Sequence, residues 1–572
     1  MKRTIFIVLM IVLAGNVFAQ QRNKKTNPAA KKETAVQTKK DTLPSRTVTV
    51  TSAFQPSLKT TSKVNFSAAT PSPDTSRNVL EYDVPAQNIT FSYQSPALKP
   101  LAQNIDTTVH WENRSFIKAG YGNYTTPYLQ VGASLGDGIK SVVNIHGKYT
   151  SSKSSVPFQQ FSKLNLDGIG IFTTANNKNE WTGKLLYDNN TQYQYGFLPD
   201  TLQFTKDDLR QRFTTFGGGF ALRNKTQNAA GISYNPGISL NMFQDNHGST
   251  ESNFIINAPM SKSFGTIFAF NLGLKADITT YKSDSAGTIN NNLYALTPAI
   301  QFKTPNLKLV AGVSPTWDNA VLSFLPNITA EAKIKNEKFI LQAGWIGYFN
   351  KTTYQYLASL NPWLQQPKNL LNTRIKEQYA GFKGSAGTHV TYDAKVSYLQ
   401  YSNQPLFVND TITGKSFHVV NESEMKNIRI HGEIGYTMQE KLSLLAGVTF
   451  NQYSGLKDNE KAWGLLPIEV NGSLRWQVLK DFLVKSDIYF WDGTQYRNKS
   501  LGSQKLKPAA DLNLGVEFTI LPQLNAWVQM NNLFNNKYQR WNQYPVLGFN
   551  VLAGVVYSFG DIKSKFNSIS NN

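Results

Sequence analysis

The last strand-like segment of the chain, residues 549–559, constrains the fold most strongly. Alternate positions form an apolar face with aromatic residues at both ends: Phe549, Val551, Ala553, Val555, Tyr557 and Phe559. The other face carries Asn550, Gly554 and Ser558, together with the apolar Leu552 and Val556. Membrane β-barrel strands have this pattern, because their apolar outer face meets lipid, rings lie at both interfaces and the inner face is more polar. A soluble β-protein ending in an amphipathic strand is the alternative.

The first 19 residues have the pattern of a secretory signal peptide. Met1-Lys2-Arg3 is basic, residues 5–13 are apolar, and Val17-Phe18-Ala19 offers small residues at the usual cleavage spacing. We therefore expect an exported chain, cleaved after Ala19, and this favours the membrane barrel over the soluble protein. The sequence has no cysteine, which excludes disulfides, thiolate metal sites and a lipoprotein anchor.

Composition favours a barrel over a helical membrane protein. After the signal peptide no apolar run approaches the ~20 residues that a membrane helix needs, while 12% of the residues are aromatic and the mean hydropathy is −0.35. Only helices and closed barrels satisfy backbone groups in lipid. The net charge of +21 comes partly from the lysine-rich residues 20–47. Because no nucleic-acid motif accompanies it, we interpret the rest as surface and lumen charge, and we expect no nucleic-acid partner.

The number of strands follows from the short turn signals between alternating segments. These signals lie near 136–138, 176–177, 224–225, 262–263, 305–306, 335–336, 386–387, 439–440, 480–481 and 522–523. Ten inner turns separate eleven hairpins, which predicts an all-β, antiparallel up-and-down barrel of about 22 strands, within a range of about 16 to 22. It would extend from residue 114 to residue 560.

Three segments show the expected alternation clearly. Residues 267–279, 442–450 and 524–531 each place apolar side chains at every second position. A soluble sandwich would also show period 2, so the signal peptide and the final strand decide between the two folds.

The residues before the final strand resemble the C-terminus of TonB-dependent outer-membrane receptors. The similar positions are Asn531 to Tyr538, Tyr544-Pro545 and the strand start at Gly548. The resemblance implies a plugged barrel of 22 strands that takes up a solute across the outer membrane. However, these receptors carry a plug domain of well over a hundred residues, and only residues 20–113 are available here. We expect a basic linker at 20–47, an extension or reduced plug at 48–113, and a polar tail at 561–572.

One segment of the extension is similar to the TonB-contact segment of these receptors. Thr47, Val48, Thr49, Val50 and Thr51 are β-prone, and strand addition to a partner needs only exposed β-prone backbone. The alternative is that this segment docks on or inside its own barrel.

Candidate ligand contacts lie on the longest expected outer loops, near 188–208, 350–373 and 402–425. The candidates are Tyr193, Tyr195, Phe197, Tyr354, Tyr356 and Trp363. Residues 361–364 also resemble a loop segment of the receptor family. The alternative is that these rings pack on one another and hold the loops shut.

No pattern indicates catalysis, a metal site or a cofactor. The six histidines are scattered, and no nucleophile elbow or phosphate loop is present. We expect a receptor-like channel or transporter gated by the reduced plug, with outer-membrane lipids, TonB or another periplasmic partner, and the barrel-assembly machinery as partners. The alternative is a non-transporting barrel that serves as a subunit or docking platform of an envelope complex.

Overall fold

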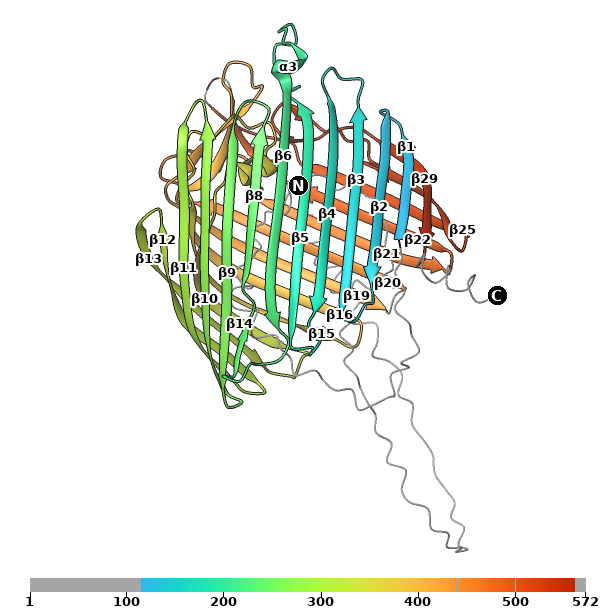
Figure 1. Ribbon diagram of the computed structural model, residues 1–572. Coiled ribbons are helices and arrows are strands. Elements are labelled where there is room, and N and C mark those ends of the chain that lie inside the picture. Colours follow the sequence, from blue (N-terminus) through green and yellow to red (C-terminus); the bar gives the residue numbers. More distant parts are fainter. Residues whose placement is uncertain (1–114, 439–440, 499, 501, 561–572) are drawn as a thin grey trace, which may run out of the picture. The chain divides into compact units, whose positions relative to one another are not determined.

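The computed structural model describes residues 115–438, 441–498, 500 and 502–560. Their strands form one antiparallel sheet of 23 strands in which the last strand pairs with the first, so the sheet closes into a barrel (Figure 1). The short β7 and β8 both pair with β9 and follow one another across Asn235-Pro236, so they occupy one strand position of the barrel. We call each such strand position a stave. Counting them once leaves 22 staves, as the turn signals predicted.

The staves of the first half are β1 (Ser115–Gly122), β2 (Thr126–Gly136), β3 (Ser141–Lys153), β4 (Gln160–Thr173), β5 (Asn179–Tyr193), β6 (Arg210–Asn224), β7 (Ile232–Tyr234) with β8 (Gly237–Asp245), β9 (Thr250–Phe264), β10 (Phe268–Ser283), β11 (Gly287–Lys303) and β12 (Leu307–Asp318). Those of the second half are β13 (Val321–Lys333), β14 (Ile340–Asn350), β15 (Thr373–Ala386), β16 (Val390–Ser402), β19 (Met425–Met438), β20 (Leu442–Ser454), β21 (Ile468–Leu479), β22 (Phe482–Trp491), β25 (Ala509–Leu521), β26 (Leu524–Asn531) and β29 (Asn550–Phe559).

The ten predicted turns all connect consecutive staves at one end of the barrel, which we call the turn end. One was misplaced: β9 continues through residues 262–263, and the turn lies at 265–267, where Gly265 has a φ of 64° that favours glycine. Residues 439–440 lie outside the described part of the chain. The opposite end carries the longer connections, and we call it the loop end.

The loop end holds the remaining short elements of the described chain. They are the helices α3 (Lys206–Leu209) and α4 (Tyr354–Leu360), and the hairpins β17 (Gln404–Asn409) with β18 (Phe417–Glu422), β23 (Gln495–Arg497) with β24 (Ser503–Lys505), and β27 (Gln539–Trp541) with β28 (Tyr544–Pro545). Neither helix is long and apolar enough to cross a membrane.

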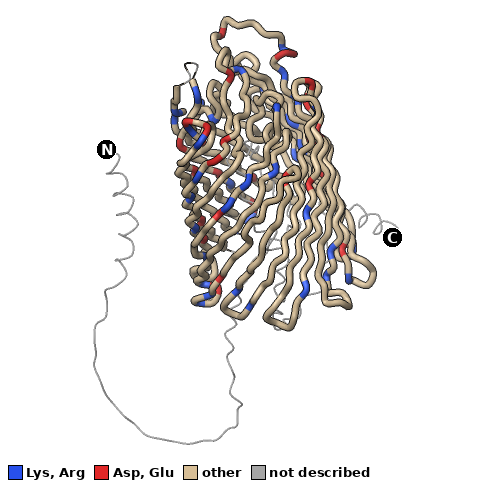
Figure 2. Tube along the Cα trace, turned by 90° about the vertical axis from the view of Figure 1, so that its left-hand side faces the viewer, with Lys and Arg blue, Asp and Glu red and all other residues tan. Residues whose placement is uncertain are grey.

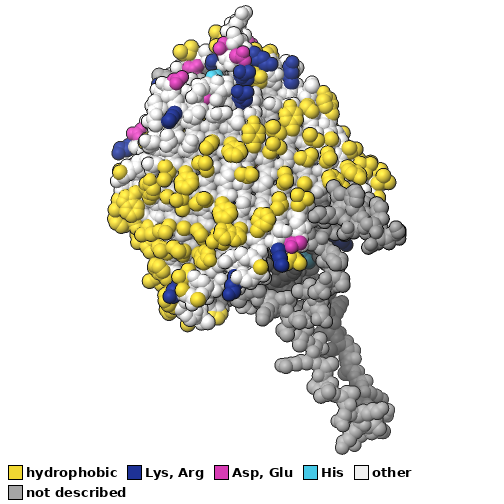
Figure 3. Space-filling model, in the orientation of Figure 1, with side chains coloured by type: hydrophobic (Ala, Val, Ile, Leu, Met, Phe, Trp, Pro, Cys, Tyr) yellow, Lys and Arg dark blue, Asp and Glu magenta, His cyan; other side chains and the backbone are white. Residues whose placement is uncertain are grey.

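The predicted alternation sorts side chains into an outer apolar belt and an inner lining. In β10, Phe268, Phe270 and Leu274 are exposed on the outside, while Asp277 and Thr279 are buried inside. In 524–531 the buried Trp527 and Gln529 flank the exposed Val528, and in 442–450 exposure alternates from Ala446 to Phe450 but not near the turn, where Ser443 and Leu445 are exposed as well. Figure 3 shows the exposed hydrophobic side chains spread as a belt around the middle of the visible face. The belt is the surface that the hydrocarbon of a bilayer requires.

The barrel closes between β29 and β1, where two glycines face each other. Gly120 pairs with Gly554, and a Cβ on Gly554 would lie 2.0 Å from the carbonyl oxygen of Ala119. Trp527, 1% exposed, covers Gly120 from inside the barrel, and Leu552 and Val556 pack in the same cluster. This cluster explains why the inner face of the last strand carries two apolar residues.

Charged side chains on the inner face form pairs of opposite sign. Nζ–carboxylate distances are 2.7 Å for Lys383–Glu331, 3.2 Å for Lys395–Glu377 and 3.7 Å for both Lys485–Glu517 and Lys351–Asp277. Basic and acidic positions both occur along the strands in Figure 2. The described inner strand positions therefore combine both signs of charge.

Candidate functional site: the loop cap and its pocket

Four connections meet at the loop end: residues 194–209, 351–372, 403–424 and 532–549. We call them together the cap. Backbone hydrogen bonds join them: Leu198 N–H donates to Thr413 at 3.0 Å, Gln365 N–H to Phe417 at 2.7 Å, and Phe417 N–H to Trp363 at 3.1 Å. The fourth connection joins through the Tyr195 hydroxyl, which donates to the carbonyl of Pro545 at 2.8 Å.

An aromatic cluster fills the interior of the cap. Trp363 stacks on Tyr544 with ring centroids 4.0 Å apart, and Tyr195 packs edge-on against both. Tyr354 packs against Phe213 and Phe243 on the barrel wall. Further members are Tyr281, Leu357, Leu364, Leu370, Phe407, Phe417 and Trp541. Because the cluster draws on the wall and on all four connections, it attaches the cap to the barrel.

Helix α4 is attached at its N-terminus by acidic groups of the wall. The Glu251 carboxylate accepts from the backbone N–H groups of Tyr354, at 2.5 Å, and Gln355, at 3.1 Å. These are N–H groups that a helix start leaves without intrahelical partners. The Tyr354 hydroxyl donates to Asp245 at 2.9 Å. Burial, with the Asp245 carboxylate beside it, raises the pKa of Tyr354 well above its ordinary value, so the hydroxyl remains a donor.

The far end of the same connection is attached by two asparagines. Asn372 and Asn291 exchange amide hydrogen bonds of 2.6 and 2.9 Å, and Asn372 also donates to Asp318 at 2.7 Å. Asn291 donates to the carbonyl of Thr352 at 2.9 Å as well. Both ends of residues 351–372 are therefore fixed to the wall. The middle is also bonded to it, because Trp363 Nε1–H donates to the carbonyl of Tyr193 at 3.1 Å and Gln211 donates to the carbonyl of Leu364 at 3.2 Å.

A second carboxylate joins two neighbouring connections. Glu422, at the end of β18, accepts from the backbone N–H groups of Lys457 at 2.7 Å, Asp458 at 3.0 Å and Asn459 at 2.8 Å. Burial alone would raise the pKa of Glu422, but these hydrogen bonds outweigh it and hold the pKa below its ordinary value. Glu422 is thus ionised where it attaches the β17–β18 hairpin to residues 455–467.

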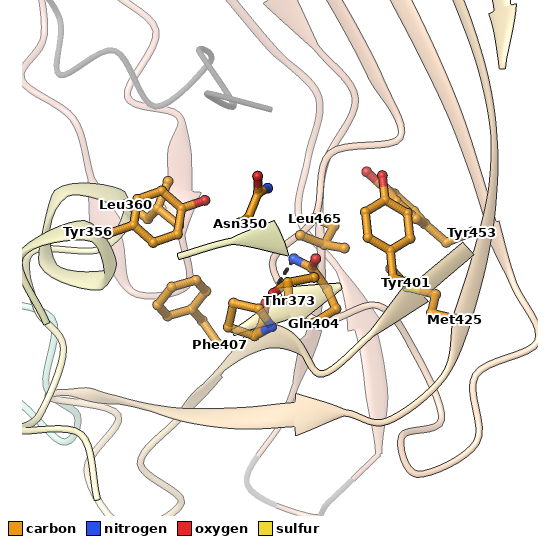
Figure 4. A pocket seen from close by; sticks show the side chains of 11 residues that line it. Asn350, Tyr356, Leu360, Thr373, Tyr401, Gln404, Phe407, Met425, Tyr453 and Leu465 are labelled. Carbon is orange, nitrogen blue, oxygen red and sulfur yellow. Dashed lines mark hydrogen bonds between the residues drawn. The ribbon is translucent and has the colours of Figure 1, made fainter. Parts of the chain in front are cut away.

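A pocket lies under the cap, against the ends of β14 to β20. With the cap closed, the space within the pocket that a water-sized molecule can occupy is about 30 Å³, so a larger solute needs the cap to move. Figure 4 shows Tyr356 and Leu360 of α4 on one side and Tyr401, Met425 and Tyr453 on the other. The remaining lining residues are Asn350, Thr373, Gln404, Pro405, Phe407 and Leu465. Burial raises the pKa of Tyr356 to about 12, so its hydroxyl can donate a hydrogen bond at neutral pH.

The structure brings only some of the predicted ligand contacts together. Tyr356 lines the pocket, whereas Tyr195, Trp363 and the fully buried Tyr354 lie in the aromatic cluster of the cap. Two further candidates lie elsewhere: Tyr193 is the last residue of β5, and Phe197 packs on Phe204. Packing of rings on one another, the stated alternative, therefore describes the surroundings of Tyr195, Tyr354 and Trp363. The candidate TonB-contact residues Thr47 to Thr51 lie outside the described residues.

The sequence reasoning missed Tyr401 and Tyr453, which end β16 and β20 on the inner face. Extending the period-2 alternation to the last residues of each strand would have found them. Also, the first predicted loop began too early, because residues 188–193 belong to β5. Within the described residues no group of three or more His, Asp or Glu side chains could hold a metal ion.

Comparison with known proteins supports the fold. No protein-family model and no curated protein matches the chain. Among solved structures, the FrpB iron transporter from Neisseria meningitidis matches at TM-score 0.61 and 11% identity, over 78% of this chain and 81% of that one. The siderophore receptor PirA from Acinetobacter baumannii matches at TM-score 0.61 and 10% identity, over 78% and 80%. The ferric enterobactin receptor PfeA from Pseudomonas aeruginosa matches at TM-score 0.59 and 10% identity, over 78% and 81%.

At these identities the likeness shows the fold. The protein has the closed 22-strand barrel fold of TonB-dependent receptors, which confirms the fold implied by the resemblance of its C-terminal residues. The similar solved proteins are receptors and transporters.

Proposed function

We propose that this protein is a receptor-like transporter of the outer membrane, which binds a small organic solute beneath its cap and passes it through the barrel. The observation that carries the proposal is the pocket between α4 and the inner ends of β14 to β20. It lies at the loop end of the lumen, where a solute entering the barrel would first be held.

The lining of the pocket indicates the kind of solute. Three tyrosine rings provide apolar faces with hydroxyls, and Asn350, Thr373 and Gln404 provide neutral donors and acceptors. No charged side chain lines the pocket. This chemistry suits an uncharged polar solute with flat or apolar faces. The iron and siderophore receptors named above supply a precedent for the fold.

Two barriers would control passage in this proposal. The cap is the outer barrier, because its connections are bonded to one another across the loop end. Residues 48–113 are the inner barrier, a reduced plug, and Thr47 to Thr51 are the segment that would pair with TonB. These last two assignments concern residues outside the described part of the chain.

A docking platform for an envelope partner is the second candidate. The extent of the buried cluster in the cap favours it, because Tyr354, Leu357 and Leu364 are fully buried and a sealed barrel needs no pathway.

Single-channel conductance in planar bilayers separates the two. Mature protein and a variant lacking residues 20–112 would be compared, with folding checked by heat-modifiable electrophoresis. A closed mature protein that conducts after the deletion supports gated transport. Steady conductance from both forms indicates an open porin-like channel, and silence from both folded forms supports the platform.

A further inference from the structure

The outward-facing charges of the barrel wall have one sign. Strand alternation assigns the outer face to Lys153, Arg210, Arg212, Lys262, Lys282, Arg374, Lys376 and Lys426, of which Arg210 pairs with Asp207 of α3. By the same alternation, every Asp and Glu in the described barrel strands faces inward. All of these cations except Lys262 lie within four residues of the end of their strand that faces the loops.

Bilayer hydrocarbon alone would produce the opposite bias. On the lipid face of a barrel, Arg and Lys cost more than Asp and Glu at equal depth. Outward strand positions that carry cations and no acids among the described residues therefore favour another partner for the charge. Snorkelling of long side chains explains how such cations are tolerated there, but not why acids are missing.

Two of the lysines lie at the same level of the barrel, at the loop-end border of the apolar belt. Lys376 of β15 and Lys426 of β19 both pair with Gln400 of β16, so they are two strand spacings, about 10 Å, apart. We call Lys376, Gln400 and Lys426 the rim patch. Arg374 lies two residues nearer the loops, where it donates to Ser402 at 3.1 Å.

The surroundings of the rim patch place it at a membrane interface. Directly below it, Tyr398, Ile428 and Val396 are 36%, 42% and 52% exposed on the same face. The stem of Lys426 passes beside Gly455, just beyond the end of β20, so its ammonium points towards the loop end. Neither lysine has a carboxylate within 4.0 Å among the described residues. The acid next to Lys376 in sequence, Glu377, is buried on the inner face, and the acid nearest to Lys426, Glu424, is exposed in the loop before β19.

We propose that the rim patch binds the phosphate of a membrane lipid headgroup in the leaflet at the loop end. Two ammonium groups and an amide about 10 Å across present donors to phosphate oxygens, while the exposed side chains below contact the acyl chains. The remaining outer-face cations at the loop end would attract the same anionic surface more weakly.

The test uses the full-length protein in dodecyl maltoside micelles and bisphosphorylated lipid A as the probe. Binding is followed by native mass spectrometry and by the rise in the thermal unfolding midpoint. Lys376→Gln with Lys426→Gln should raise the apparent Kd roughly 30-fold, about fivefold for each cation lost. Lys262→Gln with Lys303→Gln, the same charge change at the turn end, should leave the Kd within about twofold of the wild type.

Lys376→Arg with Lys426→Arg keeps the charge and should bind lipid A as the wild type does. This variant tests the role of the charge even if the glutamine variant folds poorly. Binding should also weaken with added salt. The proposal is overturned if the rim variant binds lipid A as tightly as the turn-end control, or if dephosphorylated lipid A binds equally well. Full competition by millimolar inorganic phosphate would also contradict it, because the site would then recognise a free anion.

Discussion

Replacing Gly554 with valine is expected to prevent stable closure of the barrel. Any Cβ at this position would lie 2.0 Å from the carbonyl oxygen of Ala119 and 2.5 Å from Cα of Gly120. Backbone atoms cannot move aside as a flexible side chain can, so the β29–β1 pairing must separate locally. We expect the free energy of unfolding in lipid vesicles to fall by about 3 kcal/mol or more, measured by guanidinium titration of tryptophan fluorescence.

Ala553→Val is the matched control, because Ala553 adjoins Gly554 but is exposed on the outer face. It should fold with the stability of the wild type, since the added methyl groups meet lipid rather than backbone. Equal stability of the two variants would show that the close approach at Gly120 and Gly554 does not determine closure.

Tyr354→Ala is expected to open the cap without unfolding the barrel. The side chain is fully buried, packs on Phe213 and Phe243, and hydrogen bonds to Asp245. Loss of a buried aromatic ring costs about 3–5 kcal/mol. Here it lowers the free energy needed to open residues 351–372 rather than that needed to unfold the barrel. Amide hydrogen exchange in that connection should accelerate at least roughly a hundredfold, while exchange in β10 remains unchanged.

Tyr354→Phe separates packing from the hydrogen bond. It keeps the ring and removes only the donor to Asp245, which still accepts from Gln366 at 3.1 Å. We expect a loss of about 1–2 kcal/mol, and so a smaller rise in exchange. If amide hydrogen exchange in residues 351–372 is as slow in the alanine variant as in the wild type, the cap does not depend on this cluster.

The sequence predicted the barrel well because barrel strands are specified locally. Turn residues and period-2 alternation repeat along the chain, so the number of staves and the outward faces of 267–279, 442–450 and 524–531 could be derived before any contact was known. The misplaced turn at 262–263 shows the limit: lysine and serine there continue β9, and Gly265 determines the turn.

The cap could not be derived in the same way. Its contacts join residues far apart in sequence, such as Tyr195 with Pro545 and Glu251 with Tyr354, and no local pattern encodes such pairings. Aromatic loop residues therefore suggested ligand contacts, whereas the structure buries Tyr354 and packs Tyr195 on Trp363. The inner ends of the barrel strands supply five of the eleven residues that line the pocket, and the connections supply the other six.

The central claim is that the cap opens to admit a solute, and a reversible crosslink tests it most directly. Gln365 and Ser416 belong to different connections, and Nε2 of the glutamine lies 2.7 Å from the serine hydroxyl. Because the sequence has no cysteine, Gln365→Cys with Ser416→Cys would introduce its only thiols. A short bifunctional thiol-reactive reagent with a cleavable disulfide would join them, since cysteine is shorter than the glutamine it replaces. The crosslink would be made in the variant lacking residues 20–112, and conductance recorded before and after reduction. The account predicts a closed channel when crosslinked and a conducting one when reduced, with each single-cysteine variant conducting throughout. Equal conductance of the crosslinked and reduced forms would contradict it.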